Sequence, residues 1–84
     1  MGDNKVVHSM KGQILAKTES RRYVVRPTDS FQIELVPFEK FHNKCTFPPE
    51  MLDENGLLKD GLILELVRVE NGWLYPNHKI YKHI

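Results

Sequence analysis

The run Leu62-Ile63-Leu64-Glu65-Leu66-Val67-Arg68-Val69 is followed, after Glu70, by Asn71-Gly72 and then by Trp73-Leu74-Tyr75. Only two charged residues interrupt the apolar residues of the first run, which is typical of a strand buried on both faces. We therefore expect residues 62–69 to form the central strand of a sheet. The Asn-Gly pair predicts a β-hairpin, because a type I′ turn needs positive φ at both central residues.

Three shorter stretches upstream also have strand character, with short polar turns between them. They span residues 13–17, 21–26 and 31–35. In the last of these, Phe31, Ile33 and Leu35 alternate with polar residues, which predicts a strand whose apolar side is buried. Short connections between successive strands favour an antiparallel meander.

The middle of the chain is irregular and contains two candidate helical turns. Phe38 and Phe41 are three residues apart, as in one apolar face of a single turn. A Pro-Pro pair at 48–49 and Gly56 bracket a second short helix or 3₁₀ turn, because Pro suits the start of a helix and Gly its end. A last strand is expected over residues 79–84.

The length and the pattern together predict the architecture. Residues 1–10 are expected to be a flexible N-terminal segment, which leaves residues 11–84 as a single β-barrel-like domain. Short strands in a flat sheet would leave exposed edges and one uncovered apolar face. We therefore predict a mostly β fold, a small antiparallel five-stranded SH3-like or OB-like barrel with one short helical turn.

The part of the chain after Leu35 resembles small bacterial SH3-like β-barrel domains. The likeness is carried by Val36-Pro37, by Pro48-Pro49, and by Lys59-Asp60-Gly61 leading into Leu62-Ile63-Leu64. It covers roughly a third of the chain and contains no catalytic signature. The stretch from Phe38 to Phe47 departs from the pattern as an insertion, so the resemblance implies a fold and little about function.

Composition excludes several classes of protein. A formal charge of +1 rules out a simple polycation that binds phosphate by bulk charge, and one Cys rules out a disulfide framework. There is no apolar run of 18 residues and no secretory signal pattern, so we expect a cytoplasmic protein that does not cross a membrane.

The sequence contains no convincing catalytic, metal or cofactor site. Cys45 with His42 supplies a thiol and an imidazole, but a small barrel offers little cleft for them. If Gly56 is aligned with the required glycine of a calcium loop, Met51 and Leu62 fall where oxygen ligands are needed. We therefore expect no catalytic residue, no metal and no cofactor.

Charge is unevenly distributed, which suggests a nucleic-acid surface as one alternative. Residues 1–26 carry six Lys and Arg against two acids (+4), residues 27–70 carry four against nine (−5), and residues 71–84 carry two against none (+2). If the two basic ends meet, cations can follow phosphates while rings stack on bases. The candidate nucleic-acid-binding residues are Arg21, Arg22, Tyr23, Arg26, Trp73, Tyr75, Lys79 and Lys82.

The other alternative, which we favour, is a small non-catalytic accessory or regulatory module that binds a protein partner as a monomer or weak homodimer. Aromatic residues in a loop that cannot all reach a small core are candidate anchors, and clustered acids add charge complementarity. The candidate protein-binding residues are Phe38, Phe41, Phe47, Glu50, Asp53 and Glu54. The same aromatics would otherwise cap one end of the barrel.

Overall fold

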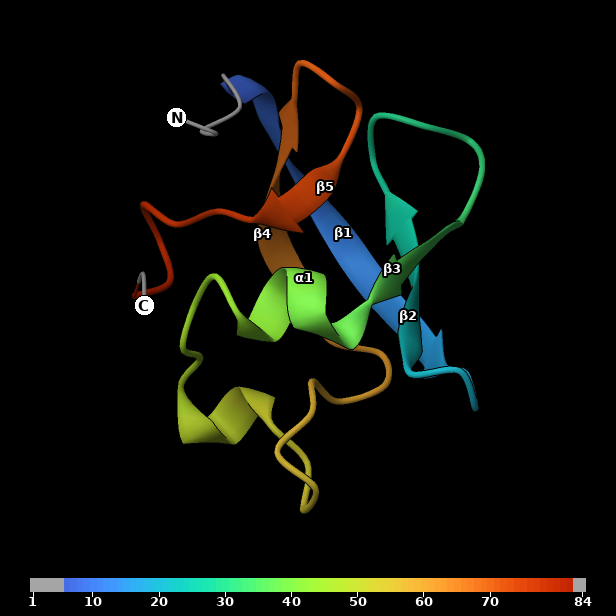
Figure 1. Cartoon of the computed structure of the whole chain (residues 1–84), viewed down its shortest axis with the longest axis vertical. Coiled ribbons are helices and arrows are strands. Elements are labelled where there is room, and N and C mark those ends of the chain that lie inside the picture. Colours follow the sequence, from blue (N-terminus) through green and yellow to red (C-terminus); the bar gives the residue numbers. More distant parts are fainter. Residues whose placement is uncertain (1–5, 83–84) are drawn as a thin grey trace.

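The computed structural model describes residues 6–82 and contains one curled antiparallel sheet (Figure 1). Its strands lie in the order β3-β2-β1-β4-β5. The elements in chain order are β1 (Val6–Lys17), β2 (Arg22–Pro27), β3 (Glu34–Pro37), α1 (Phe38–His42), the 3₁₀ turn η1 (Pro49–Met51), β4 (Ile63–Val69) and β5 (Leu74–Pro76).

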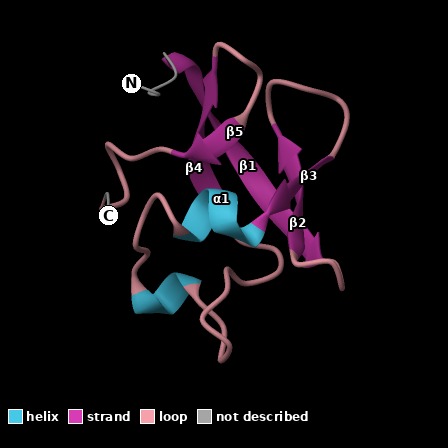
Figure 2. Cartoon of the chain, in the orientation of Figure 1, coloured by secondary structure: helices cyan, strands magenta, loops and turns pink. Residues whose placement is uncertain are grey.

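The predicted fold class is confirmed: the protein is mostly β, with a small five-stranded antiparallel sheet and one short helix (Figure 2). The sheet curls into a half-barrel, and within residues 6–82 its two edge strands, β3 and β5, do not pair with each other. We call the face that packs on α1 and the core the inner face, and the opposite one the outer face.

The middle strand of the sheet is β1, not residues 62–69 as expected. β1 pairs with β2 on one side and with β4 on the other, so β4 stands one place from the centre. β1 also begins at Val6, five residues before the expected domain start, because residues 6–10 pair with β4. Residues 1–5 of the expected flexible segment lie outside the described residues.

The hairpin between β4 and β5 exists as predicted, but its turn is not type I′. The Gly72 N–H donates to the Val69 carbonyl at 2.9 Å and the Val69 N–H donates to the Trp73 carbonyl at 3.0 Å. Gly72 has φ +92°, whereas Asn71 is not among the residues with positive φ. The loop is therefore a three-residue turn with glycine at its left-handed position, the next most common hairpin.

The hairpin between β1 and β2 repeats this geometry without a glycine. The Arg21 N–H donates to the Thr18 carbonyl at 3.2 Å, and the Thr18 N–H donates to the Arg22 carbonyl at 2.9 Å. Arg21 occupies the left-handed position with φ +62°, which costs an L residue roughly 1 kcal/mol. Its guanidinium carbon lies 5.2 Å from the centroid of the Phe38 ring.

The core lies between the inner face of the sheet and α1. Its largest fully buried side chains include Tyr23, Phe41, Ile14, Leu64 and Leu66. The predicted helical turn is confirmed as α1, which buries its two aromatic side chains. The second predicted turn is the 3₁₀ turn η1, which begins at Pro49 as expected from proline at the start of a helical turn.

The described part of the C-terminal segment forms a turn instead of the strand expected over residues 79–84. The carbonyl of Asn77 accepts hydrogen bonds from the N–H groups of Ile80 and Tyr81 at 2.9 and 3.0 Å. The Tyr81 hydroxyl accepts the Glu65 N–H at 2.9 Å, which fixes the segment against β4. Residues 83–84 of the expected strand lie outside the described residues.

Candidate functional site

The aromatic residues predicted as partner anchors lie in or against the core. Phe38 and Phe41 are buried, with ring centroids 4.6 and 5.5 Å from that of Tyr23. Phe47 is partly buried and packs against the core, 5.2 Å from the ring of Tyr81. These rings therefore close one end of the half-barrel, and none of the three offers a free anchor.

The acids of the predicted protein-binding set have different surroundings. Glu50 and Glu54 are exposed. Asp53 instead accepts the Asn55 and Leu57 N–H groups at 2.8 and 3.1 Å, and the hydrogen bond from Leu57 holds the pKa of its carboxyl below the usual value. The Asp53 carboxylate shapes a turn, so the acidic cluster is only partly available to a partner.

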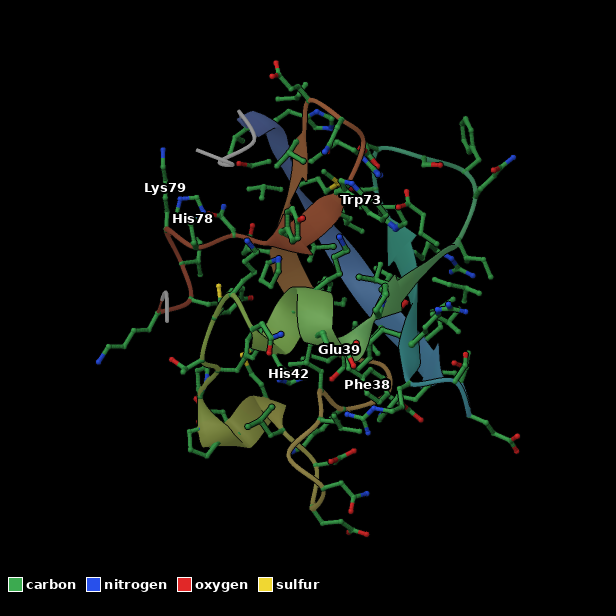
Figure 3. All side chains as sticks on the ribbon, in the orientation of Figure 1. Phe38, Glu39, His42, Trp73, His78 and Lys79 are labelled. Carbon is green, nitrogen blue, oxygen red and sulfur yellow. The ribbon has the colours of Figure 1, made fainter. Side chains whose placement is uncertain are left out.

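The predicted nucleic-acid set is not brought together. Its arginines lie at the β1–β2 hairpin and on β2, whereas Lys79 and Lys82 follow β5, and two strands separate β2 from β5. Figure 3 shows Lys79 at the left margin of the molecule, beyond α1 and the sheet. The inference that the two basic ends share a face is therefore wrong, because β1 pairs with both β2 and β4 and keeps β2 and β5 apart.

Tyr23 is a structural residue and offers no surface for stacking. Its hydroxyl accepts the Leu58 N–H at 2.8 Å and lies 2.6 Å from His42 Nε2. Burial raises the pKa of Tyr23 to about 12, and burial together with the charge of Arg21 lowers the pKa of His42. A neutral imidazole therefore accepts the tyrosine O–H, and the pair ties β2, α1 and the 52–58 loop together.

Cys45 is likewise part of the packing. Its side chain is buried, and burial raises the pKa of its thiol, which disfavours the reactive thiolate. The neighbouring Thr46 N–H donates to the Lys82 carbonyl at 2.8 Å. The Cys45 region is thus a contact between the loop after α1 and the C-terminal segment.

Trp73 and Tyr75, the other two aromatics of the predicted nucleic-acid set, do form a cluster with cations. Trp73 remains 47% exposed, and Lys40 Nζ lies 3.7 Å from its ring centroid. Lys44 Nζ lies 5.2 Å from the centroid of Tyr75, and Lys40 lies 5.6 Å from it. The lysines come from α1 and the residues just after it, which the sequence interpretation did not include.

Four exposed apolar side chains lie on the outer face and on the loop before β3, and we call them the outer apolar surface. It consists of Phe31, Ile33, Leu35 and Ile63, which are 108%, 52%, 54% and 61% exposed. Leu35 and Ile63 lie on β3 and β4, and the other two precede β3. Several large apolar side chains exposed on one face are typical of an interaction site.

The strand predicted over residues 31–35 is displaced to Glu34–Pro37: Phe31, Gln32 and Ile33 lie exposed in the loop before it, and Leu35 faces the opposite way from the one expected. Glu34 points inward, where its carboxylate accepts hydrogen bonds from Arg68 Nη1 at 3.1 Å and Nη2 at 2.6 Å. Val36 is the apolar residue of β3 that enters the core. Because successive side chains of a strand point to opposite faces, Leu35 must face outward.

Arg68 is the centre of an ion-pair cluster that holds this arrangement. Its Nε and Nη2 donate to the two carboxylate oxygens of Asp29, both at 2.8 Å, and Nη1 also donates to the Gly72 carbonyl at 2.9 Å. The hydrogen bond from Arg68 lowers the pKa of Asp29. His8 Nε2, 3.0 Å from Asp29 Oδ2, lowers this pKa further. The cluster thereby joins β4, the β4–β5 hairpin, β3 and the loop before β3.

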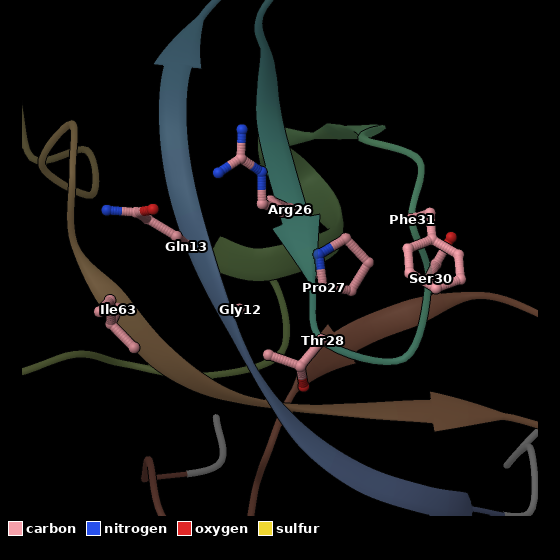
Figure 4. A pocket seen from close by; sticks show the side chains of 8 residues that line it. All are labelled: Gly12, Gln13, Arg26, Pro27, Thr28, Ser30, Phe31 and Ile63. Atoms are coloured by element: carbon pink, nitrogen blue, oxygen red, sulfur yellow. The ribbon is translucent and has the colours of Figure 1, made fainter.

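A hollow of about 410 Å³ opens in the outer face next to these residues. Phe31 and Ile63 form apolar walls, and Arg26 and Gln13 line it from β2 and β1 (Figure 4). Arg26 and Gln13 are register partners, so they stand side by side on the outer face. The hollow therefore combines apolar walls with one guanidinium.

The sequence interpretation missed the outer apolar surface because alternation does not reveal which face is buried. One available signal was Arg68, a charge inside an otherwise apolar strand. A partly buried guanidinium needs carboxylate partners, and an inward-pointing acid such as Glu34 meets that need. An acid on the inner face of β3 places the apolar neighbours of that acid on the outer face.

Within residues 6–82, no three His, Cys, Asp or Glu side chains gather in an arrangement that would hold a metal ion. No helix in this part of the chain has the length and hydropathy needed to cross a membrane. Comparison with protein-family models, with curated proteins and with solved structures finds no match to this chain.

Proposed function

We propose that the protein is a small non-catalytic accessory or regulatory module that binds a protein partner through the outer apolar surface. The observation that carries this proposal is the orientation of β3. A strand that sends an acid into the molecule and leaves Leu35 with its apolar neighbours in water loses burial energy unless another surface covers it.

The polar side chains in and around the core support the same proposal. Tyr23, His42 and Cys45 are the side chains most suited to chemistry, and each serves the packing of the core or of a loop. The ion-pair cluster of Arg68 fixes β3 in one orientation, so Leu35 is presented by an element that is held in place. A rigid surface loses little conformational entropy when it binds.

A random-peptide display selection tests the proposal directly. Peptides enriched on the wild-type protein should lose binding to a Phe31→Ser, Leu35→Ser double variant and keep binding to a Lys40→Ala, Trp73→Ser control. The melting temperature of both variants shows whether the fold survives. Selection of no peptide, or of peptides that bind the double variant equally well, would contradict the proposal.

Nucleic-acid binding is the alternative, and the cluster of Trp73, Tyr75, Lys40 and Lys44 is the observation that favours it. An exposed indole beside one ammonium group, with a second ammonium group over the neighbouring tyrosine ring, offers a stacking surface and phosphate contacts. Titration of labelled single-stranded oligonucleotides at low and moderate salt tests it. Steeply salt-dependent binding that is lost in the Lys40→Ala, Trp73→Ser variant would favour this alternative.

A further inference from the structure

Two arginines of β2 stand beside the outer apolar surface without acidic partners. Arg22 and Arg26 are exposed, and neither side chain makes a hydrogen bond or ion pair within residues 6–82. Arg68, in contrast, bonds two carboxylates. The two β2 guanidinium groups are therefore free to bind an external anion.

Their position relative to the apolar side chains is set by the register of the sheet. Val24 lies between them on β2 and pairs with Leu35 on β3. Since strand residues rise about 3.3 Å each, Arg22 and Arg26 lie about 13 Å apart along the strand, on the same face. The two cations thus flank an apolar centre.

The outward-facing acid of β4 is not paired with either arginine in the sheet register. Glu65 of β4 also faces outward, since it stands between the buried Leu64 and Leu66, and its register partner on β1 is Lys11. Arg26 instead pairs with the neutral Gln13. The region between β2 and β3 is therefore positively charged as well as apolar, which favours an occupant with the opposite charge.

We propose that the outer apolar surface binds an extended segment of a partner protein in which an apolar side chain is flanked by carboxylates. This inference rests on the proposed function and specifies the class of partner. The apolar side chain packs against Val24 and Leu35, which lie between the two arginines, and the carboxylates accept hydrogen bonds from Arg22 and Arg26. Guanidinium groups suit this role because they bind carboxylates with two parallel hydrogen bonds.

Three synthetic nine-residue peptides test the chemistry. The first has a leucine flanked by aspartates two residues away on each side, in a background of Gly, Ser and Thr. The second has lysines in place of the aspartates, and the third has serine in place of the leucine. We expect the first peptide to bind at least tenfold more tightly than either of the others in fluorescence anisotropy at physiological salt.

A charge reversal on the protein gives the sharper test. Arg26→Glu should weaken the aspartate peptide at least tenfold and strengthen the lysine peptide, so that the preference reverses. Lys79→Glu is the matched control, because it makes the same change of charge at an exposed residue after β5, which two strands separate from β2 (Figure 3). It should leave the order of the three peptides unchanged.

The outcomes separate this inference from the proposed function. Equal binding of the acidic and basic peptides, abolished by Leu35→Ser, would overturn the inference while leaving the proposed function intact. Absence of binding by all three peptides would also overturn it, and the display selection would then decide the proposed function by itself. Adsorption to vesicles containing anionic lipid, or a dimer that Arg26→Glu dissociates, would assign the surface to a membrane or to a second copy.

Discussion

The two faces of the sheet carry similar side chains in opposite environments. The inner face buries Tyr23 and Leu66 completely, and Phe41 of α1 is buried against it, whereas on the outer face Leu35 and Ile63 are exposed to water. Both faces obey the two-residue period of a strand. The alternation of residues along a strand therefore shows that it has two different faces. The partners of its charged side chains determine which of the two faces enters the core.

The two faces should also contribute differently to the stability of the fold. Inner side chains contribute burial energy and should be costly to truncate, since a domain of this length has only a small stability to lose. The exposed outer side chains, such as Leu35 and Ile63, contribute little to folding. Each substitution below tests one side of this division.

Phe41→Ala should have the largest effect on stability. The side chain is fully buried in the core, and truncating a buried phenylalanine costs about 3–5 kcal/mol, enough to unfold much of so small a domain. Phe31→Ala removes the same atoms from an exposed position and should leave the unfolding free energy within about 0.5 kcal/mol. Urea denaturation of both variants measures this, and similar losses would contradict the division into two faces.

Gly12→Val should be the next most destabilising change. A Cβ at this position would clash with Leu66 Cδ1 and lie 3.4 Å from the Arg26 carbonyl oxygen, so the added methyl groups overpack the inner face. Overpacking of this kind typically costs about 1–3 kcal/mol. Its sequence neighbour Lys11 is exposed on the outer face, and Lys11→Ala serves as the control with no expected shift of the urea midpoint.

Tyr23→Phe removes one hydroxyl from the inner face and keeps the ring. The Leu58 N–H loses its acceptor and His42 loses its donor, and an unsatisfied buried N–H costs about 1–3 kcal/mol. We expect a lower urea midpoint with an unchanged m-value. Tyr75→Phe, at a half-buried residue whose hydroxyl has no hydrogen bond among residues 6–82, should leave the midpoint where it is.

Much of the fold could be predicted because local residue chemistry determines it. Short-range residue preferences, which can be read from neighbouring residues, determine the meander, the helical turn at Phe38 and the turn at Gly72. The position of β1 in the middle of the sheet could not be found that way. It depends on pairing between residues 6–13 and 63–69, which are far apart in the sequence.

The candidate site was harder to predict, since exposure is a property of the whole fold. Phe38 and Phe41 were predicted as anchors because they lie in an irregular segment, yet the irregular segment folds over the open side of the half-barrel. Phe31 and Leu35 were assigned to the core by their alternation. The long-range pairing of Arg68 with Asp29 and Glu34 reverses that assignment.

Acidification should weaken the cluster that orients β3. Arg68 holds the pKa of Asp29 below its usual value of 3.8, so the stabilisation is complete above that pH and is lost as the pH falls through the lower, folded-state value. Asp29→Asn should therefore lower the urea midpoint at pH 5 and have a smaller effect at pH 3. An equal effect at both pH values would show that Asp29 acts by packing alone.

Leu35→Ser should have the smallest effect on stability, and it is the change that distinguishes the two faces most directly. The side chain is 54% exposed, so replacement by a hydroxymethyl group should leave the unfolding free energy within about 0.5 kcal/mol of wild type. Val36→Ser, one residue further on the same strand, removes a buried side chain and should cost several times more. If both substitutions were costly, Leu35 would belong to the folded core and the outer surface would need no partner. If only Val36→Ser is costly while Leu35→Ser abolishes binding of the selected peptides, the exposed side of β3 serves recognition and the buried side serves the fold.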